Sequence, residues 1–336
     1  MPRKAVNILL LVAIVLIMAL AAAFFREYEV PPVAPAGKVA FEIGPGWTVR
    51  AIARDLQERG IIRRSWAFLA GYKLFHEGQK IRAGEYELDL PLKAKDVLLT
   101  LLKGKILLHP LTVPEGLTTR EVADLIRDAG FPVRGSFLEA CGDAGPIASW
   151  DGQAADLEGY LFPDTYQFAK GAPARTVAEA MVKEFRKVFG EAGLRRAADL
   201  GMTVRSVVTL ASLIEKETSV PDERPLVSAV FHNRLRIGMK LDCDPTVIFA
   251  LKRDGLYRGR LLSRDLKYPS HYNTYVSPGL PPGPICSPGR NSLRAALYPA
   301  PEKYLYFVAN NDGAHHFSRS YAEHLLAVKK YQLKKS

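Results

Sequence analysis

A single glutamate interrupts a long apolar run in the C-terminal half of the chain. The segment SVVTLASLIE, residues 206–215, carries Glu215 where packing alone would favour leucine or alanine. At helical spacing Glu215 lies on a side shared with Val208 and Ala211, and a second apolar side adjoins it. The pattern predicts a helix buried around most of its circumference, from which Glu215 emerges at the end into a cleft or an ion pair.

A carboxyl group in such surroundings could act as an acid. Burial raises the pKa of a carboxyl group because the charged form loses water that it cannot replace. A glutamate that keeps its proton near neutral pH can protonate a leaving oxygen, as cleavage of a glycosidic bond requires. The alternative is a structural ion pair between Glu215 and Arg234 or Arg236, because perturbed carboxylates also occur in such pairs.

Two further charged residues are candidates for a supporting role. Glu217 would face away from Glu215 in a helix, so its expected work is capping or pairing, and a role in catalysis or in substrate binding is the alternative. The next helix is expected to begin at Asp222 and to end at Gly238. It carries Arg234, the best candidate for orienting a carboxylate, for which a surface ion pair is the other possibility.

A proline- and glycine-rich segment, YNTYVSPGLPPGPICSPG, occupies residues 272–289. It combines aromatic faces with amide and hydroxyl groups, the mixture that suits a sugar ring. We expect a sugar-binding cleft lined by Asn273, Thr274 and Tyr275. Its wall would be shaped by Gly279, Pro281 and Pro282. A rigid surface loop without ligand contact is the alternative.

An aspartate and two histidines complete the set of candidate polar residues. Asp244 precedes a proline, which predicts that it caps the next helix, with substrate binding as the alternative. The adjacent His315 and His316 have no third metal ligand at a suitable spacing, so we predict neither a metal nor a cofactor. His315 is a candidate for hydrogen bonding to substrate or to Glu215.

The start of the chain predicts a membrane anchor. The segment VNILLLVAIVLIMALAAAFF contains no charge and is long enough to cross roughly 30 Å of hydrocarbon as a helix. Arg3 and Lys4 favour a cytoplasmic N-terminus, which places everything after Arg26 outside the cytoplasm. A cleaved signal peptide is the alternative, although the apolar stretch is longer than usual for one. We therefore predict a cytoplasmic tail at residues 1–5, a span at 6–25 and a linker at 26–37.

The rest of the chain has the composition of a folded protein. With 336 residues, 48% of them hydrophobic, it can form two or three modest domains. The net charge of +11 would suggest nucleic acid in a cytosolic protein, but the predicted topology and the lack of a recognisable module disfavour it, and anionic lipid or an acidic wall polymer fits better. The oxidation state of Cys141, Cys243 and Cys286 stays open.

The exported part begins with a strand, two helices and a strand, expected at 38–43, about 48–59, 65–75 and 84–88. The pattern Gly-x-Thr-x-Arg-x-x-Ala at Gly46 recurs 70 residues later at Gly116, with Thr48 and Thr118 as expected N-caps. Either one small unit is reused, or two capped helices share a start signal. Further helices are expected at about 174–189 and up to Leu200, so the predicted fold class is α+β.

Several long segments, in this order, closely resemble the YceG-like family of endolytic murein transglycosylases. They are LEGYLFPDTY, ASLIEKETSVPDERPLVSAVFHNRLRIGMKLDCDPTV, YNTYVSPGLPPGPICSPG and YLYFVANNDGAHHFS. The resemblance implies a catalytic domain at 157–333, in which Glu215, the first glutamate of the Glu-Lys-Glu-Thr motif, is catalytic. It also implies a glycan-binding LysM-like module at 38–105, for which a plain spacer is the alternative, and a connecting segment at 106–156.

The chain departs from the family pattern at three positions. Asp242 and Cys243 stand where the family usually has glutamine and then serine or threonine, so substrate contacts from these two positions are not carried over. Leu325 stands where the family commonly has asparagine. His315 does match the family's Gly-x-His-x-Phe pattern.

The implied reaction is non-hydrolytic cleavage of the β-1,4 bond between N-acetylmuramic acid and N-acetylglucosamine within a peptidoglycan strand. Glu215 would protonate the departing oxygen and then take a proton from the 6-hydroxyl of the muramic acid, which leaves a 1,6-anhydro end. Because the substrate supplies the nucleophile, no second carboxylate is required. A hydrolase could draw on Glu158, Glu217, Asp242 and Asp244.

The expected partners are peptidoglycan strands and membrane lipid, and the resemblance adds peptidoglycan synthases. The expected location is the inner membrane, with the catalytic domain outside the cytoplasm. Two alternatives to a lytic transglycosylase stay open: a hydrolytic muramidase, and a membrane-tethered scaffold that binds the wall without cutting it.

Overall fold

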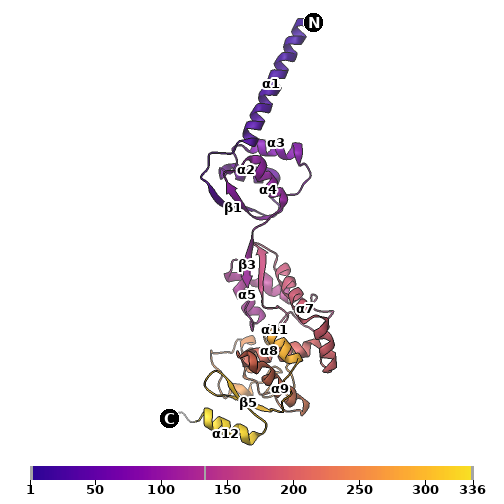
Figure 1. Ribbon diagram of the computed structural model, residues 1–336, viewed down its shortest axis with the longest axis vertical. Helices are drawn as coiled ribbons and strands as arrows, with labels where there is room; N and C mark the ends of the chain where they lie inside the picture. The colour runs from indigo at the N-terminus through magenta and orange to yellow at the C-terminus, as the bar shows by residue number, and fades with distance from the viewer. Residues whose placement is uncertain (1–2, 132–133, 334–336) are drawn as a thin grey trace. The chain divides into compact units, whose positions relative to one another are not determined.

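The computed structural model describes residues 3–131 and 134–333, and the fold is mixed α+β, as the sequence predicts (Figure 1). The chain divides into two compact units, Met1–His109 with Gln167–Gly171, and Pro110–Tyr166 with Ala172–Ser336. Residues 1 and 2 of the predicted tail, and residues 132 and 133 of the predicted connecting segment, lie outside the described residues.

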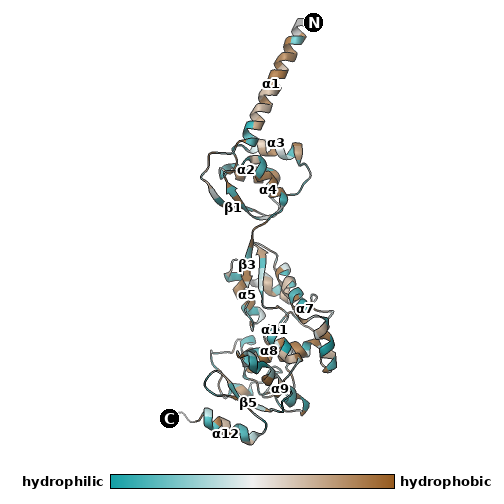
Figure 2. Cartoon of the chain, viewed as in Figure 1, coloured by the Kyte–Doolittle hydropathy of each residue, from teal (hydrophilic) through white to brown (hydrophobic). Residues whose placement is uncertain are grey.

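The first helix, α1 (Arg3–Glu29), is the predicted apolar segment. Its stretch Val6–Glu29 is long and apolar enough to cross a membrane, and Figure 2 shows the hydrophobic colouring along it. The helix does not end at Phe25, because its last turn packs into the first unit. Phe24 stacks on Tyr28 at 5.0 Å between ring centroids, and Tyr28 is only 3% exposed. The predicted linker at 26–37 is therefore partly helical.

The first unit has the predicted order of two strands around two helices. Its elements are β1 (Gly37–Ile43), α2 (Val49–Glu58), α3 (Ser65–Phe75), β2 (Gly84–Leu90) and a further helix, α4 (Ala94–Lys103). The two strands pair antiparallel over their whole length. The Thr48 side chain accepts a hydrogen bond from the Ala51 amide at 3.2 Å, so the predicted N-cap is confirmed.

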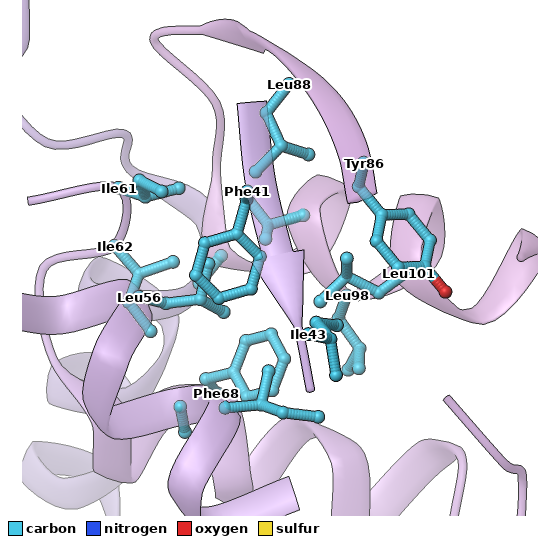
Figure 3. Close-up of a cluster of buried hydrophobic side chains, with 14 of the residues drawn as sticks. Phe41, Ile43, Leu56, Ile61, Ile62, Phe68, Tyr86, Leu88, Leu98 and Leu101 are labelled. Atoms are coloured by element: carbon cyan, nitrogen blue, oxygen red, sulfur yellow. The ribbon is translucent and has the colours of Figure 1, made fainter. Parts of the chain in front are cut away.

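The core of the first unit lies between this sheet and its helices (Figure 3). Phe41 and Tyr86 are opposite each other across the strands and are both fully buried. The neighbouring pair, Ala40 and Glu87, points to solvent. This alternation is what the period of two along a strand requires when one face of the sheet is covered. The helices add Leu56, Phe68, Leu98 and Leu101 to the core.

The same order of elements occurs a second time. It consists of β3 (Leu108–Thr112), α5 (Thr119–Asp128), α6 (Arg134–Cys141) and β4 (Thr165–Ala169), and β3 pairs with β4. Thr118 caps α5 in a capping box with Glu121. The two matching sequence patterns thus belong to two strand–helix–helix–strand arrangements, which favours reuse of one small unit over a shared helix start alone. The unit boundary crosses both strands of the second arrangement.

The remainder of the second unit is mainly helical. It contains α7 (Ala174–Asp199), α8 (Val204–Glu217), α9 (Arg224–Arg236), α10 (Asp244–Arg253), α11 (Arg290–Leu297) and α12 (Tyr321–Tyr331), with the hairpin β5 (Tyr306–Ala309) and β6 (His315–Ser318). A kink at Gly190 divides α7 into the two helices that the sequence predicts. Helix α8 packs against α7, α9, α10 and α11.

Burial of α8 agrees with the prediction from its sequence. All eight residues from Val207 to Ile214 are at most 1% exposed. A helix without a polar face is stable only when other elements cover it on most sides. The packing around α8 therefore fixes the position of its last turn, where Glu215 lies.

Candidate active site

Glu215 lies in the last turn of α8 and is held at both carboxylate oxygens. Its side chain is 6% exposed. The Arg224 guanidinium donates to Oε1 at 3.2 Å, and the Gly289 amide donates to Oε2 at 2.8 Å. The structure therefore shows an ion pair, but its arginine is Arg224 and neither Arg234 nor Arg236. The apolar surroundings that we expected for Glu215 include a buried cation.

Three helix ends converge on this carboxylate. The residues Pro221–Glu223 form a short 3₁₀ turn between α8 and α9, and this turn brings Arg224, the first residue of α9, back to the end of α8. Gly289 is the N-cap of α11. Arg224 is held on its other side by the Ser292 hydroxyl of α11 at 3.1 Å, and its side chain is 8% exposed. The ends of α8, α9 and α11 thus position Glu215.

A turn from the second strand–helix–helix–strand arrangement completes the site. The Gly116 amide donates to Ser287 O at 2.9 Å, and Lys216 donates to Gly116 O at 3.2 Å. This turn carries Glu115, whose Oε2 lies 3.9 Å from Arg224 Nη2. Burial and the negative charge of Glu215 raise the pKa of Glu115, although Arg224 opposes this. Two carboxylates therefore share one guanidinium.

Arg224 and Glu115 were not among the predicted site residues. The short connection between α8 and α9 could have pointed to Arg224. A short turn between two helices brings the first residues of the second helix back to the end of the first helix. A signal for Glu115 was its place in the repeated pattern, where the first copy has Pro45. An acidic residue that appears in only one copy of a reused unit is a candidate for function.

Glu217 belongs to a second polar cluster beside the end of α8. It hydrogen-bonds with the buried thiol of Cys243, and desolvation raises the pKa of Glu217 to about 7. Asp244, His315 and Arg234 are its charged or titratable neighbours. The structure thus brings together the predicted residues Glu217, Arg234 and His315, while Glu215 has other partners.

His315 reaches the Glu215 ion pair only through an intermediate residue. Its backbone amide and its Nδ1 donate to the two carboxylate oxygens of Glu223 at 2.6 and 2.7 Å. Burial opposes ionisation of Glu223, but hydrogen bonds from His315 and Thr218 outweigh it and lower the pKa of Glu223. Glu223 directly precedes Arg224. The predicted bond from His315 to Glu215 is replaced by this bond to Glu223, and contact with substrate stays a prediction.

Arg234 fixes the backbone around the start of α10. It donates to Leu305 O at 2.7 Å and to Leu241 O at 2.9 Å, and its guanidinium lies 5.3 Å from the ring centroid of Tyr306. Its carboxylate partner is Asp242, at 3.4 Å. Arg234 thus binds a carboxylate, as expected, but that carboxylate is Asp242 and not Glu215, and the pair is not a surface pair because Arg234 is 8% exposed. A role towards substrate stays a prediction.

The loop predicted to line a sugar cleft holds two of its three candidates inside. Asn273 is 0% exposed and donates to Tyr268 O at 2.8 Å. Thr274 is 1% exposed and accepts from the Cys243 amide at 3.0 Å. Both side chains stabilise the loop, and this burial does not favour direct glycan contact, which stays a prediction. Tyr275 is partly exposed.

Asp244 does not cap α10. It is the first helical residue, the N-cap is Cys243, and the Asp244 carboxylate accepts the Tyr275 hydroxyl at 2.6 Å. The prediction that Asp244 caps α10 is therefore wrong, and the Asp244 carboxylate binds the loop instead. Other loop residues border a cavity of 710 Å³ that is lined in part by Tyr272, Val276, Ser277, Arg205 and Arg253.

Across residues 3–131 and 134–333, no group of three or more histidine, cysteine, aspartate or glutamate side chains is arranged to hold a metal ion. Cys141, Cys243 and Cys286 are buried and free.

Comparison with known proteins decides the family. The model of the YceG-like family matches residues 41–330. The chain belongs to the YceG-like family. This YceG-like chain is similar to the endolytic murein transglycosylase of Bacillus subtilis (strain 168), with 31% identity over 309 residues that cover 87% of this chain and 84% of the relative.

Two further proteins extend the comparison. The endolytic murein transglycosylase of Streptococcus pneumoniae (strain D39) is 26% identical over 321 residues, which cover 85% of this YceG-like chain and 57% of the relative. A crystal structure of a YceG-like protein from Listeria monocytogenes superposes with a TM-score of 0.59 at 32% identity. It covers 86% of this chain and 98% of the other.

Proposed function

We propose that this YceG-like protein is an endolytic peptidoglycan transglycosylase. It cleaves the β-1,4 bond between N-acetylmuramic acid and N-acetylglucosamine within nascent strands and leaves 1,6-anhydro ends. The names of its relatives support the activity. The observation that carries the residue assignment is the carboxylate of Glu215, shielded from water and fixed by Arg224 and the Gly289 amide.

Glu215 acts first as an acid and then as a base. In its protonated form it donates to the glycosidic oxygen, which leaves with the N-acetylglucosamine. The 6-hydroxyl of the muramic acid then closes onto its own anomeric carbon, and the Glu215 carboxylate takes the hydroxyl proton. No water is consumed, and the residue ends each cycle protonated. Between the two steps, Arg224 and the Gly289 amide stabilise the carboxylate, because charge-assisted hydrogen bonds favour the ionised form.

A hydrolytic muramidase is a second candidate, and one observation favours it. Glu115 is a second carboxylate beside Glu215, joined to it through Arg224. Glycosidases that use water need two carboxyl groups. The two reactions differ in their products, since hydrolysis leaves a reducing end and the transglycosylase leaves an anhydro end.

The first helix supports the proposed location. We place α1 in the inner membrane with its N-terminus in the cytoplasm, which holds the second unit on the wall side of the membrane. The strands cut there are newly made, so peptidoglycan synthases are the expected protein partners. The LysM-like role of residues 38–105 as a glycan-binding module is part of the same proposal.

The test is a digestion of uncrosslinked glycan polymer by the purified full chain in detergent. Mass spectrometry of the products should find internal cuts with 1,6-anhydro ends. Reducing ends would establish the hydrolytic alternative. If the strands stay intact under conditions where the chain binds them, the protein is a wall-binding scaffold and the proposed activity is wrong.

A further inference from the structure

We propose that Glu115 is a positioning residue of the reaction, which engages the same guanidinium nitrogen as Glu215 and so allows Glu215 to hold the proton that the leaving oxygen needs. This inference rests on the proposed function and extends it. Glu115 lies on the turn before α5, 100 positions from Glu215 in the chain.

The turn that carries Glu115 is attached firmly to the site. The Gly116 amide donates to Ser287 O at 2.9 Å, and the Ser287 amide donates to Leu117 O at 2.8 Å. Lys216, next to Glu215, donates to Gly116 O at 3.2 Å. Backbone bonds in both directions leave little freedom for the turn, so Glu115 is placed by the fold.

The position of Glu115 also explains why residue 289 is a glycine. A Cβ atom added to Gly289 would lie 1.9 Å from Glu115 Oε1, which is far closer than any real contact. The absence of a side chain there gives the Glu115 carboxylate its place beside Arg224. The same glycine supplies the amide that binds Glu215. One residue thus accommodates one carboxylate and binds the other.

Charge balance explains what Glu115 does. A buried arginine next to a lone glutamate would favour the ionised carboxylate and oppose proton donation. A second carboxylate beside the same guanidinium makes it less favourable for both carboxylates to be ionised at once, because like charges repel each other. The charged groups at this place are Glu115, Glu215, Lys216 and Arg224, and Lys216 makes its hydrogen bond to a backbone carbonyl. Burial and then the charge of Glu215 raise the pKa of Glu115, while Arg224 lowers it.

The two carboxylates differ in access to solvent. The Glu115 side chain is 46% exposed, whereas that of Glu215 is 6% exposed. The exposed group can exchange protons with water, and the shielded group can present a proton to a bound strand. The two carboxylates can take these different roles only while both lie next to Arg224.

The test compares Glu115→Gln and Glu115→Asp with the matched control Glu139→Gln in the full chain. Glu139 is an exposed glutamate of α6 with the same change of charge. Glu115→Gln should slow formation of anhydro ends about tenfold, and the pH above which cleavage declines should fall by about one unit. Glu115→Asp should restore part of the rate, and Glu139→Gln should match the wild type.

A second readout does not depend on turnover. In the full chain labelled with ¹³C at glutamate carboxyl carbons, Glu115→Gln should change the titration of one other carboxyl group, which Glu215→Gln identifies. An unchanged pH profile in Glu115→Gln overturns the inference even when the rate falls, because a purely structural role would lower the rate alone. An unchanged carboxyl titration overturns it as well. If the wild type gives no anhydro ends, the proposed function fails, and the titration still decides whether the two groups are coupled.

A separate observation supports a second inference, which concerns the first unit. Helix α3 exposes three large apolar side chains beside the base of α1: Trp66 at 47%, Leu74 at 67% and Phe75 at 57%. The Trp66 ring lies 6.4 Å from Phe24, and the Phe75 ring lies 6.3 Å from Tyr28, so this patch is continuous with the end of the apolar helix. Both ring contacts join α3 to the part of α1 where the apolar stretch ends and the charged residues of α1 begin.

We infer that this face of α3 rests in the interfacial zone of the bilayer that α1 enters. Tryptophan and other aromatic residues prefer the level of the lipid headgroups. The exposed Arg64 and Lys73 at the two ends of α3 suit anionic headgroups. The occupant of the patch is therefore the lipid surface, and the inference rests on α1 being a membrane span.

The test uses tryptophan fluorescence of the full chain in vesicles of anionic lipid, because α1 contains no tryptophan. Lipids brominated near the headgroup should quench the wild type, and Trp66→Phe should lose most of this quenching. Equal quenching in the wild type and in Trp66→Phe would overturn the inference. Flotation of both proteins with the vesicles distinguishes this outcome from failure of α1 to insert.

Discussion

At the scale of single residues, Glu215 offers the sharpest test of the reaction. Replacement by glutamine removes proton donation but keeps the shape of the side chain and an acceptor for the Gly289 amide. Glu215→Gln should slow strand cleavage by about 10³-fold. Its thermal midpoint should fall by no more than about 5 °C. Product analysis and thermal unfolding measure the two effects, and near-normal cleavage would rule out the assignment.

Glu158 should make folding stability depend on pH. Desolvation raises the pKa of Glu158 from 4.5 to about 8, against hydrogen bonds from the Thr119 amide. Ionisation of Glu158 therefore costs more in the folded than in the unfolded chain. Its destabilising effect is absent below pH 4.5, grows as the pH rises and is complete above about pH 8.

Glu158→Gln should remove this effect. The thermal midpoint of the variant relative to the wild type should rise steadily between those two pH values and stay constant above them. Thermal unfolding of both proteins at a series of pH values measures the difference. A constant difference across the series would contradict the raised pKa.

At the scale of elements, a substitution at Gly289, the N-cap of α11, should change the active site. Gly289 has φ −77°, so alanine is compatible with the backbone, but its Cβ would displace the Glu115 carboxylate. Gly289→Ala should lower cleavage about as much as Glu115→Gln, with little loss of stability, because a flexible side chain can move away.

The double variant separates this mechanism from simple disruption. Gly289→Ala combined with Glu115→Gln should be no slower than either single variant, since both act on the same contact. Rates that multiply would show that Gly289→Ala acts elsewhere, for example through the amide that binds Glu215.

At the scale of the whole molecule, α1 combines two tasks. Residues 6–23 are exposed along the apolar part, whereas Phe24 and Tyr28 pack onto the first unit. Removal of residues 1–22 should therefore abolish flotation with lipid vesicles and leave the thermal transition of the chain unchanged. A loss of the folding transition would show that the apolar part also stabilises the first unit.

Much of the fold could be predicted from neighbouring residues. The first pair of strands, the capped helices after Thr48 and Thr118 and the burial of α8 all follow from local periodicity and from N-cap chemistry. The pairs β3–β4 and β5–β6 were not predicted. The errors concern contacts between parts of the chain that are distant in sequence. The cap at Asp244 was displaced by one residue because Tyr275, from a distant loop, binds that carboxylate.

The sequence alone was enough to predict that an apolar helix ends in a glutamate, that two helices share one start pattern and that an apolar segment begins the chain. The groups that surround Glu215 are known only from the folded structure. Its partners Arg224, Gly289 and, through the arginine, Glu115 come from three different elements, and the Gly289 amide lies 74 positions away in the chain. Spacing along a helix or strand specifies contacts within a few residues, whereas contacts between elements depend on how buried surfaces pack, and that is a property of the whole folded unit.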